Sequence, residues 1–426
     1  MSPPAGEGRP AAYVRLVLLA GAIGIPAAFL AAVFLSVVHI VERWLWSSLP
    51  ASLGHATPPW YLVLGLPFAG GVIVLGARRL LPGDGGASPL VGLSEKPTPF
   101  VYAPGVVLAA LGTLPFGAVL GPEMPVIALG SAVGMVLVHY ARLRGREAAV
   151  LSTAGSFSAI SALFGGPIVA GVMLTEGGIG LGEALIPALL PGFVAAALGY
   201  LVFVGFGNWG GLGAPGLAVP NLPPFHGVHA ADLLVAIAVG AVTTVFITAV
   251  RRASVRAGGA GERHLGPALF LLGGGLAVGA IAIAADALGA NSQDVLFSGQ
   301  ASIPALVGET STGIVLLLLA AKALAYVVSL SCGFRGGPIF PALFLGIGVA
   351  ELAQLWFGTS PTLAVAIGAA AGMTAQTRLL LSAILFAALL VGPLDVDVVP
   401  AAVIAAASAW LTLAALDPPK AAEHAA

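Results

Sequence analysis

A glutamate between two prolines is the residue of this chain best suited to carry chemistry. Glu123 stands in the segment Gly121-Pro-Glu-Met-Pro125, inside a long apolar region. An ionised carboxylate at mid-membrane costs at least about 2.5 kcal/mol, so an acid there is expected to be paired or functional. At a helix N-terminus the helix dipole would stabilise its charge, and protonation would release it. We therefore predict a protonatable gate, and the alternative is a glutamate that only caps its own helix.

A second segment of the same kind follows 216 residues later, as Gly337-Pro-Ile-Phe-Pro341. Proline suits the first turn of a helix, and glycine lets the preceding backbone turn sharply. Each segment therefore predicts a helix start with unpaired amides, at Glu123–Met124 and at Ile339–Phe340. Two such N-termini facing each other would attract an anion without a full cation in lipid. The alternative is that each Gly-Pro pair only kinks a packed helix.

Two more landmarks recur in the same order at nearly the same spacing. Pro89 and Pro304 are 215 residues apart, and the pairs Ala154-Gly155 and Ala371-Gly372 are 217 residues apart. Three ordered matches indicate a duplicated unit. If the two copies insert with opposite topology, broken helices from both meet near the midplane, where transporters place their binding sites.

Composition places these segments in a polytopic membrane protein. Of 426 residues, 58% are hydrophobic and 8% are charged, against about 25% charged in soluble domains. The net charge of −1 offers no basic face for nucleic acid. The single cysteine, Cys332, excludes a disulfide framework, and the histidines form no ligand cluster. We expect no cofactor and no metal, and the scattered acids argue against an intramembrane enzyme.

The order of spans and charges predicts an all-α protein of two halves with many broken and tilted helices. Short arginine-rich loops stay on the cytoplasmic side, here at 78–79, 142–146 and 251–263. The stretch 205–230 contains no Lys or Arg and is expected outside. The predicted parts are a cytoplasmic lead-in (1–12), a first transmembrane repeat (13–204), an extracellular linker (205–230), a second repeat (231–416) and a short cytoplasmic tail (417–426).

The other charged residues near the spans have less specific interpretations. Arg335 either lends positive potential to the mouth of an anion path, pairs with an acid or extends its charged end to the membrane interface. Lys322 and Arg378 are expected to anchor or pair, and Glu351 is expected at the membrane interface, together with Asp395 and Asp397.

These motifs resemble the CLC family of chloride channels and chloride/proton antiporters. The family's Gly-Arg/Lys-Glu-Gly-Pro is similar to residues 121–125, and its Gly-Gly-Ile-Phe-x-Pro is similar to residues 336–341. Its Gly-Ser-Gly-Ile-Pro resembles Gly85-Gly86-Ala87-Ser88-Pro89. The likeness runs from about residue 13 to residue 416 and includes the order of the segments.

The resemblance implies a homodimer in the cell membrane with one anion pathway in each subunit and no nucleotide-binding tail. By resemblance, Glu123 matches the gating glutamate, and Glu176 matches the internal proton site, although Gly177 is the alternative in that alignment. The implied anion-binding positions are Gly85, Gly86, Ala87, Ser88, Gly121, Met124, Gly337, Ile339 and Phe340.

The chain also departs from the family pattern. Position 86 is Gly where the family has its anion-binding serine, with Ser88 two places on, and the tail contains no tyrosine. Pro122 and Pro338 lack backbone N–H groups. These departures predict weak central binding and loose coupling. Proton-coupled antiport is favoured slightly over a passive channel, and a fluoride-selective exporter remains the second transport reading.

Overall fold

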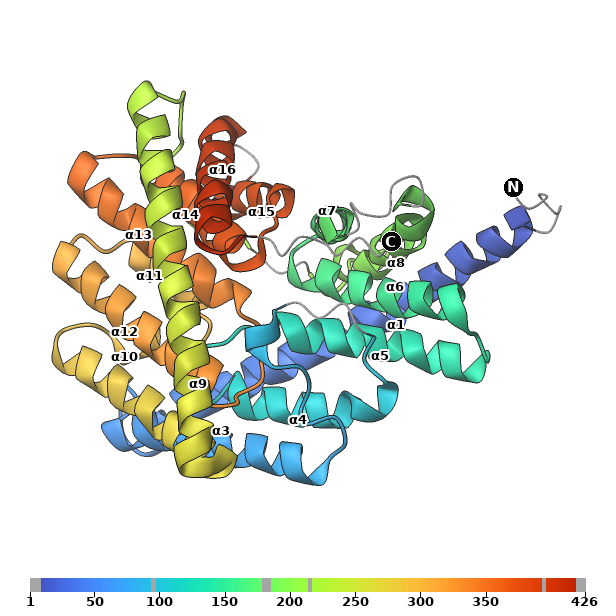
Figure 1. Ribbon diagram of the computed structural model, residues 1–426, viewed down its shortest axis with the longest axis horizontal. Helices are drawn as coiled ribbons and strands as arrows, with labels where there is room; N and C mark the ends of the chain where they lie inside the picture. Colours follow the sequence, from blue (N-terminus) through green and yellow to red (C-terminus); the bar gives the residue numbers. More distant parts are fainter. Residues whose placement is uncertain (1–8, 93–96, 178–184, 214–216, 393–395, 419–426) are drawn as a thin grey trace.

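In the computed structural model, the regular secondary structure of the described residues is helical apart from two isolated β-bridges (Figure 1). The described residues are 9–92, 97–177, 185–213, 217–392 and 396–418. The helices of the first half are α1 (Arg9–Arg43), α2 (Leu49–Ser52), α3 (Trp60–Leu80), α4 (Ala103–Thr113), α5 (Glu123–Tyr140), α6 (Gly145–Leu163), α7 (Pro167–Gly177) and α8 (Leu185–Val204). Those of the second half are α9 (Ala230–Ala287), α10 (Ser292–Val295), α11 (Ile303–Val307), α12 (Thr312–Ser331), α13 (Ile339–Phe357), α14 (Pro361–Thr377), α15 (Leu381–Val391) and α16 (Val399–Leu416).

Several helices do not match one simple crossing of a bilayer. Within the described residues, seven helices are long and apolar enough to span a membrane, while α4, α7 and α15 are shorter apolar pieces. The 35 residues of α1 extend about 50 Å, more than the roughly 30 Å of a hydrocarbon core, so this helix must tilt. The prediction of broken and tilted helices is confirmed.

The basic segment 251–263 corrects one expectation. Sequence reasoning placed these arginines in a loop, but the helix that begins at Ala230 continues through them. It breaks only at Gly266, whose φ of 75° is not helical, and a second helix follows. Long side chains of arginine can cover a helix surface without breaking it, and only the glycine with the following Pro267 ends the backbone pattern. Figure 1 shows α9 crossing the height of the molecule.

The duplication seen in the sequence is a duplication of helix packing. A Cβ on Gly130 of α5 would collide with the backbone of Gly155 in α6. Likewise, a Cβ on Gly346 of α13 would lie 2.9 Å from the Cα of Gly372 in α14. Small residues let two helices approach to backbone contact. The pairs occupy equivalent positions in the two halves, so each half contains one closely packed helix pair.

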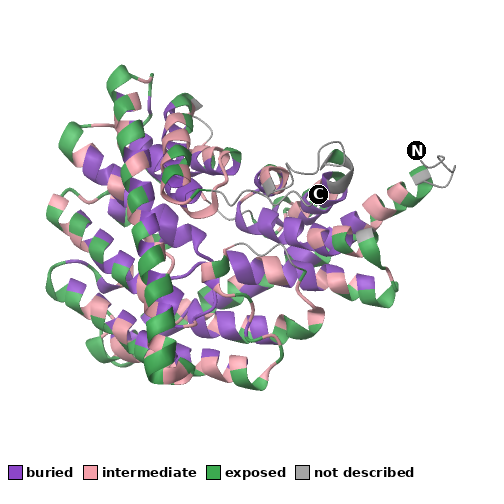
Figure 2. Ribbon diagram, in the orientation of Figure 1, coloured by how far each residue is buried: buried purple, intermediate pink, exposed green. Residues whose placement is uncertain are grey.

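The two halves meet at the starts of α5 and α13. The N–H of Gly121 donates to the carbonyl of Gly337 at 2.7 Å, and the N–H of Gly337 donates back to Gly121 at 2.5 Å. Both Gly-Pro turns are therefore held face to face, as the sequence predicted. Figure 2 shows the buried residues concentrated where the helices of the two halves converge.

Candidate functional site

Glu123 from the first half reaches the helix start of the second half. It is the first residue of α5, and its side chain is completely buried. Oε1 accepts a hydrogen bond of 2.8 Å from the backbone N–H of Phe340, in the first turn of α13. Oε2 has no hydrogen-bond partner among the described residues. The carboxylate thus occupies a position that an anion would take at the N-terminus of α13.

Two glycines leave the space that this carboxylate fills. A Cβ built on Gly337 or on Gly121 would collide with Oε2 of Glu123. Their φ angles are not in the left-handed region, so the lack of a side chain, and not backbone freedom, is what the site requires of them. Gly121, Glu123, Gly337 and Phe340 contact one another here, and Ile339 and Met124 are buried beside them. The anion-binding role of these residues stays a prediction.

The side chain of Phe340 packs and does not line an open path. Its ring stacks on Phe164, which caps the end of α6, with centroids 5.8 Å apart. Phe386 of α15 lies edge-on to both rings, at 5.1 Å from Phe164 and 6.1 Å from Phe340. All three are buried. This packing fixes the start of α13, and the backbone amide of Phe340 is the group that faces the carboxylate.

A tyrosine that the sequence reasoning missed completes the turn. Tyr326 of α12 is fully buried, and its hydroxyl donates to the carbonyl of Pro338, the N-cap of α13, at 2.8 Å. The hydroxyl and Glu123 therefore bind residues two apart on the same turn. A signal was present: Lys322, Tyr326 and Ser329 share one face of an apolar helix.

The predicted serine motif lies beside this centre and is connected to it by Arg335. Arg335 precedes Gly336 and Gly337 in the chain, and its Nε donates to the carbonyl of Asp84 at 3.0 Å. Gly85 and Gly86 have positive φ angles of 71° and 97°, which glycine tolerates. Ser88 is the N-cap of a short 3₁₀ helix (Pro89–Val91). No hydrogen bond joins the 85–88 segment to Glu123 within the described residues.

Glu176, the second predicted proton site, caps a helix of the other half. Its Oε1 accepts from the N–H groups of Leu380 and Leu381 at 2.7 and 2.6 Å. Its Oε2 accepts from the N–H and the hydroxyl of Ser382, at 2.8 and 2.5 Å. These donors form the start of α15, so the carboxylate stabilises that helix. Its role in proton movement stays a prediction.

Two charged residues inside the helices, Lys322 and Glu351, are fully buried. Lys322 is fully buried, and its Nζ donates to the carbonyls of Asp294 and Leu296 at 2.9 and 2.7 Å, over the ring of Phe344. Glu351, which was expected at the membrane interface, is instead completely buried in α13. Neither of its carboxylate oxygens has a partner among the described residues. Asp397 is exposed, and Asp395 lies outside the described residues.

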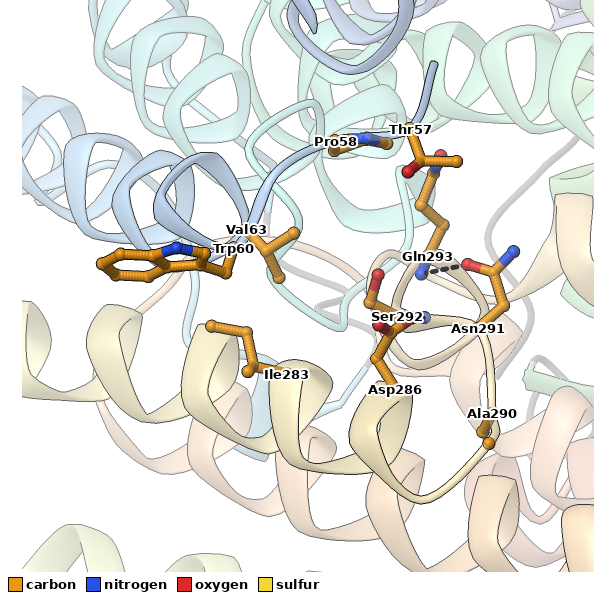
Figure 3. A pocket seen from close by; sticks show the side chains of 11 residues that line it. Thr57, Pro58, Trp60, Val63, Ile283, Asp286, Ala290, Asn291, Ser292 and Gln293 are labelled. Atoms are coloured by element: carbon orange, nitrogen blue, oxygen red, sulfur yellow. Dashed lines mark hydrogen bonds between the residues drawn. The ribbon is translucent and has the colours of Figure 1, made fainter. Parts of the chain in front are cut away.

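Among the described residues, one cavity lies away from the predicted residues and another is lined by two of them. The larger, about 360 Å³, lies between the start of α3 and the end of α9 and contains none of the predicted residues (Figure 3). Its polar wall is formed by Asn291, Ser292 and Gln293, and the side chain of Asn291 accepts from the N–H of Gln293. The smaller cavity, about 250 Å³, is lined by Ser88, Arg78 and Arg335. By volume alone, the first cavity would be the better candidate for a binding site. The second cavity, however, is lined by Ser88 and Arg335, which the sequence singled out.

The fold and this site define a class: a polytopic membrane protein with an anion-like group held between two helix N-termini. The sequence profile described as "Voltage gated chloride channel" matches residues 90–413, and the chain belongs to that family, the CLC family of anion transport proteins. A relative is YfeO of Salmonella schwarzengrund (strain CVM19633), whose name assigns it to ion transport; it is 28% identical over 405 residues, 92% of this chain and 93% of that protein. YfeO of Escherichia coli (strain K12 / DH10B) is 30% identical over 349 residues, 78% of each chain.

Solved structures of other family members share the fold. A slow cyanobacterial Cl⁻/H⁺ antiporter superposes with a TM-score of 0.76 at 18% identity, over 95% of each chain. A CLC-type fluoride/proton antiporter superposes with a TM-score of 0.71 at 21% identity, over 96% of each chain. At these identities the similarity establishes the architecture alone.

Proposed function

We propose that this CLC-family protein exchanges small anions, chloride first among them, for protons, with Glu123 as the shared group. The observation that carries the proposal is the buried Glu123 carboxylate on the amide of Phe340. A carboxylate and a small anion compete for the same N–H donors at a helix N-terminus. Binding of one therefore excludes the other.

Protonation supplies the coupling in this proposal. A neutral carboxylic acid is a weaker acceptor for the Phe340 amide than a carboxylate, because charge-assisted hydrogen bonds are the stronger ones. The side chain then leaves the helix start, and an anion enters. When the anion departs, the deprotonated side chain returns and its proton has been delivered. Each cycle thus links an anion movement to a proton movement.

Flux from liposomes tests both parts of the proposal. Purified protein is reconstituted, an anion gradient is imposed, and anion efflux and internal pH are recorded together. We expect anion movement with proton movement in the opposite sense, and Glu123→Gln should abolish the proton movement and the pH dependence of the flux. Glu147→Gln, an exposed acid at the start of α6, is the matched control and should behave as the wild type.

Two outcomes would contradict the proposal. If chloride, nitrate and fluoride gradients give no flux above empty liposomes, the transport assignment is wrong. If Glu123→Gln keeps normal proton coupling, the role given to this residue is wrong. Competition among the three anions also distinguishes a fluoride-selective exporter from a chloride transporter. The homodimer and the cytoplasmic position of both termini remain predictions.

A further inference from the structure

Two arginines, one from each half of the chain, converge on a single carboxylate beside the 85–88 segment. Arg78, near the end of α3, donates from Nε to Oδ1 of Asp84 at 2.8 Å and from Nη2 to Oδ2 at 3.3 Å. Arg335 donates from Nη2 to Oδ2 of the same side chain and from Nε to its carbonyl. The cluster therefore joins the α3 end of the first half to the turn that precedes α13.

The two guanidinium groups are much less exposed than the acid between them. The side chain of Arg335 is 7% exposed and that of Arg78 is 19% exposed, whereas that of Asp84 is 59% exposed. A charge removed from water needs a counter-charge, so Arg335 requires an anionic partner. Asp84 supplies that partner at present, but more than half of its side chain is in contact with solvent. Its carboxylate is hydrated once it leaves the arginines, whereas the arginine side chains remain largely buried and need another anion.

The arginine pair faces a cavity that is large enough for a hydrated anion. The cavity of about 250 Å³ is lined by both arginines together with Ser88, Ser331 and Gly333, and by one acid, Glu262 of α9. A water molecule needs about 30 Å³, so the space exceeds the need of a single halide. The two arginines outweigh the charge of Glu262 whenever Asp84 is displaced.

Glycines bring the arginines close to the transport centre. A Cβ on Gly85 would lie 3.3 Å from Cγ of Arg78 and 3.5 Å from Cγ of Arg335, so Gly85 lies between the two side chains. The backbone N–H of Arg335 donates to the hydroxyl of Thr113 at 3.1 Å, which fixes the turn. Two residues later Gly337 contacts the Glu123 carboxylate. An anion at the arginine pair would therefore lie beside the turn whose glycine contacts Glu123.

We propose that Arg78 and Arg335 form a second anion-binding site at the mouth of the path, where the Asp84 carboxylate competes with the entering anion. The proposal rests on the proposed transport function. It adds a step in which the entering anion binds the two arginines before it reaches Glu123. Asp84 has a φ of 49°, a conformation in which non-glycine residues are uncommon although Asp and Asn tolerate it. The Asp84 carboxylate, held there between two arginines, is a hydrogen-bond acceptor fixed to the chain, in the position that a free anion would take.

Equilibrium anion binding to the purified protein in detergent tests the competition. Asp84→Asn and Asp84→Gly both remove the competing charge, and both residues suit a positive φ. If Asp84 occupies the arginines for about nine-tenths of the time, removing it raises the apparent affinity for bromide by about tenfold. Arg335→Gln should lower that affinity by about tenfold or more, since a charge-assisted donor is lost.

The chain offers a matched control. Asp417 also lies between two arginines, with Arg251 at 2.5 Å and Arg378 at 3.2 Å. Asp417→Asn makes the same change of charge away from the cavity, and it should leave bromide affinity unchanged. An equal rise in Asp417→Asn would overturn the proposal, because the effect would then be one of net charge.

Anomalous diffraction from bromide locates the site independently of affinity and of transport. Crystals of Asp84→Asn or Asp84→Gly soaked in bromide should show density between the two guanidinium groups. Absence of that density in both variants, or unchanged affinity in both, would overturn the proposal. If wild-type liposomes carried no flux while bromide still bound between the arginines, only the transport function would fail.

Discussion

At the scale of single residues, the site depends on what is missing as much as on what is present. Glu123 can lie across the start of α13 only because positions 121 and 337 carry no side chain. The carboxylate supplies charge, the Phe340 amide supplies the donor, and the aromatic packing of Phe164 and Phe386 holds that donor in place. Each of these roles belongs to a different helix.

The substitution Gly337→Ala should therefore remove transport by displacing the Glu123 carboxylate. The new methyl group and Oε2 cannot occupy the same space, and relief requires either the side chain or the Gly121–Gly337 bridge to move. We expect anion flux in liposomes to fall at least about tenfold, as for a misplacement of roughly 1 Å at a reacting group. Gly273→Ala is the control, because a Cβ there meets nothing within 4 Å. Equal flux in both variants would show that the carboxylate does not occupy this space.

At the scale of elements, side chains that satisfy helix ends tie pairs of helices together, across the two halves and within one half. Glu176 of α7 caps the start of α15 in the other half, and Nζ of Lys322 in α12 donates to the carbonyls of Asp294 and Leu296 at the end of α10. Unpaired backbone groups at a buried helix end are costly, so each tie stabilises the fold. The capped end of α15 leads to Phe386, which packs against Phe340 at the start of α13.

The cap gives Glu176 a testable structural role. Glu176→Ala leaves the N–H groups of Leu380, Leu381 and Ser382 without an acceptor, and we expect a loss of about 1–3 kcal/mol in the free energy of unfolding. Thermal unfolding in detergent would measure it, with Glu147→Ala as the exposed control. Glu176→Gln keeps acceptor oxygen and should lose less stability. If Glu176→Gln is as stable as the wild type yet loses proton coupling, the predicted proton role gains its evidence.

At the scale of the whole molecule, two aspartates outside the membrane-spanning helices, Asp84 and Asp417, bind arginines from distant parts of the chain. Partial burial raises the pKa of Asp84, but the hydrogen bonds and charges of Arg78 and Arg335 outweigh it, and the pKa is lowered overall from 3.8. Asp417 behaves in the same way: the slight desolvation is outweighed by Arg251 and Arg378, and its pKa is also lowered. Both acids are more favourable in the ionised form when the protein is folded.

These shifts predict the sense of the acid dependence. A carboxylate with a lowered folded pKa contributes its full stability above its unfolded pKa and loses it as pH falls through the folded value. The contribution of these two groups to stability should therefore be constant above about pH 5 and should fall below about pH 4. Unfolding temperatures of the wild type and of the double variant Asp84→Asn/Asp417→Asn measure it. The double variant should lose less on acidification, and an identical loss would assign the acid sensitivity to other groups.

The sequence was most informative where a pattern repeats. The two Gly-Pro segments predicted the helix starts at Glu123 and Ile339 and their mutual approach, since proline and glycine dictate local backbone geometry. It was least informative where a charge has to find a partner. The partners of Glu176 are about 200 residues away, and Glu351, which looked interfacial, is buried. The segment 251–263 was expected to be a loop because of its arginines. The helix continues through it, since charged side chains do not by themselves break a helix.

By itself, the sequence determined that the chain lies in a membrane, that it is built from two related halves and that Glu123 stands at a helix start. Composition, period and turn residues are local properties, and they do not depend on which helix lies beside which. Only the tertiary structure decided that this carboxylate serves the helix of the opposite half, that Tyr326 completes the same turn and that two arginines meet at Asp84. Those contacts join residues far apart in the chain. They depend on how closely the helices approach one another, and glycines allow that approach by packing against backbone.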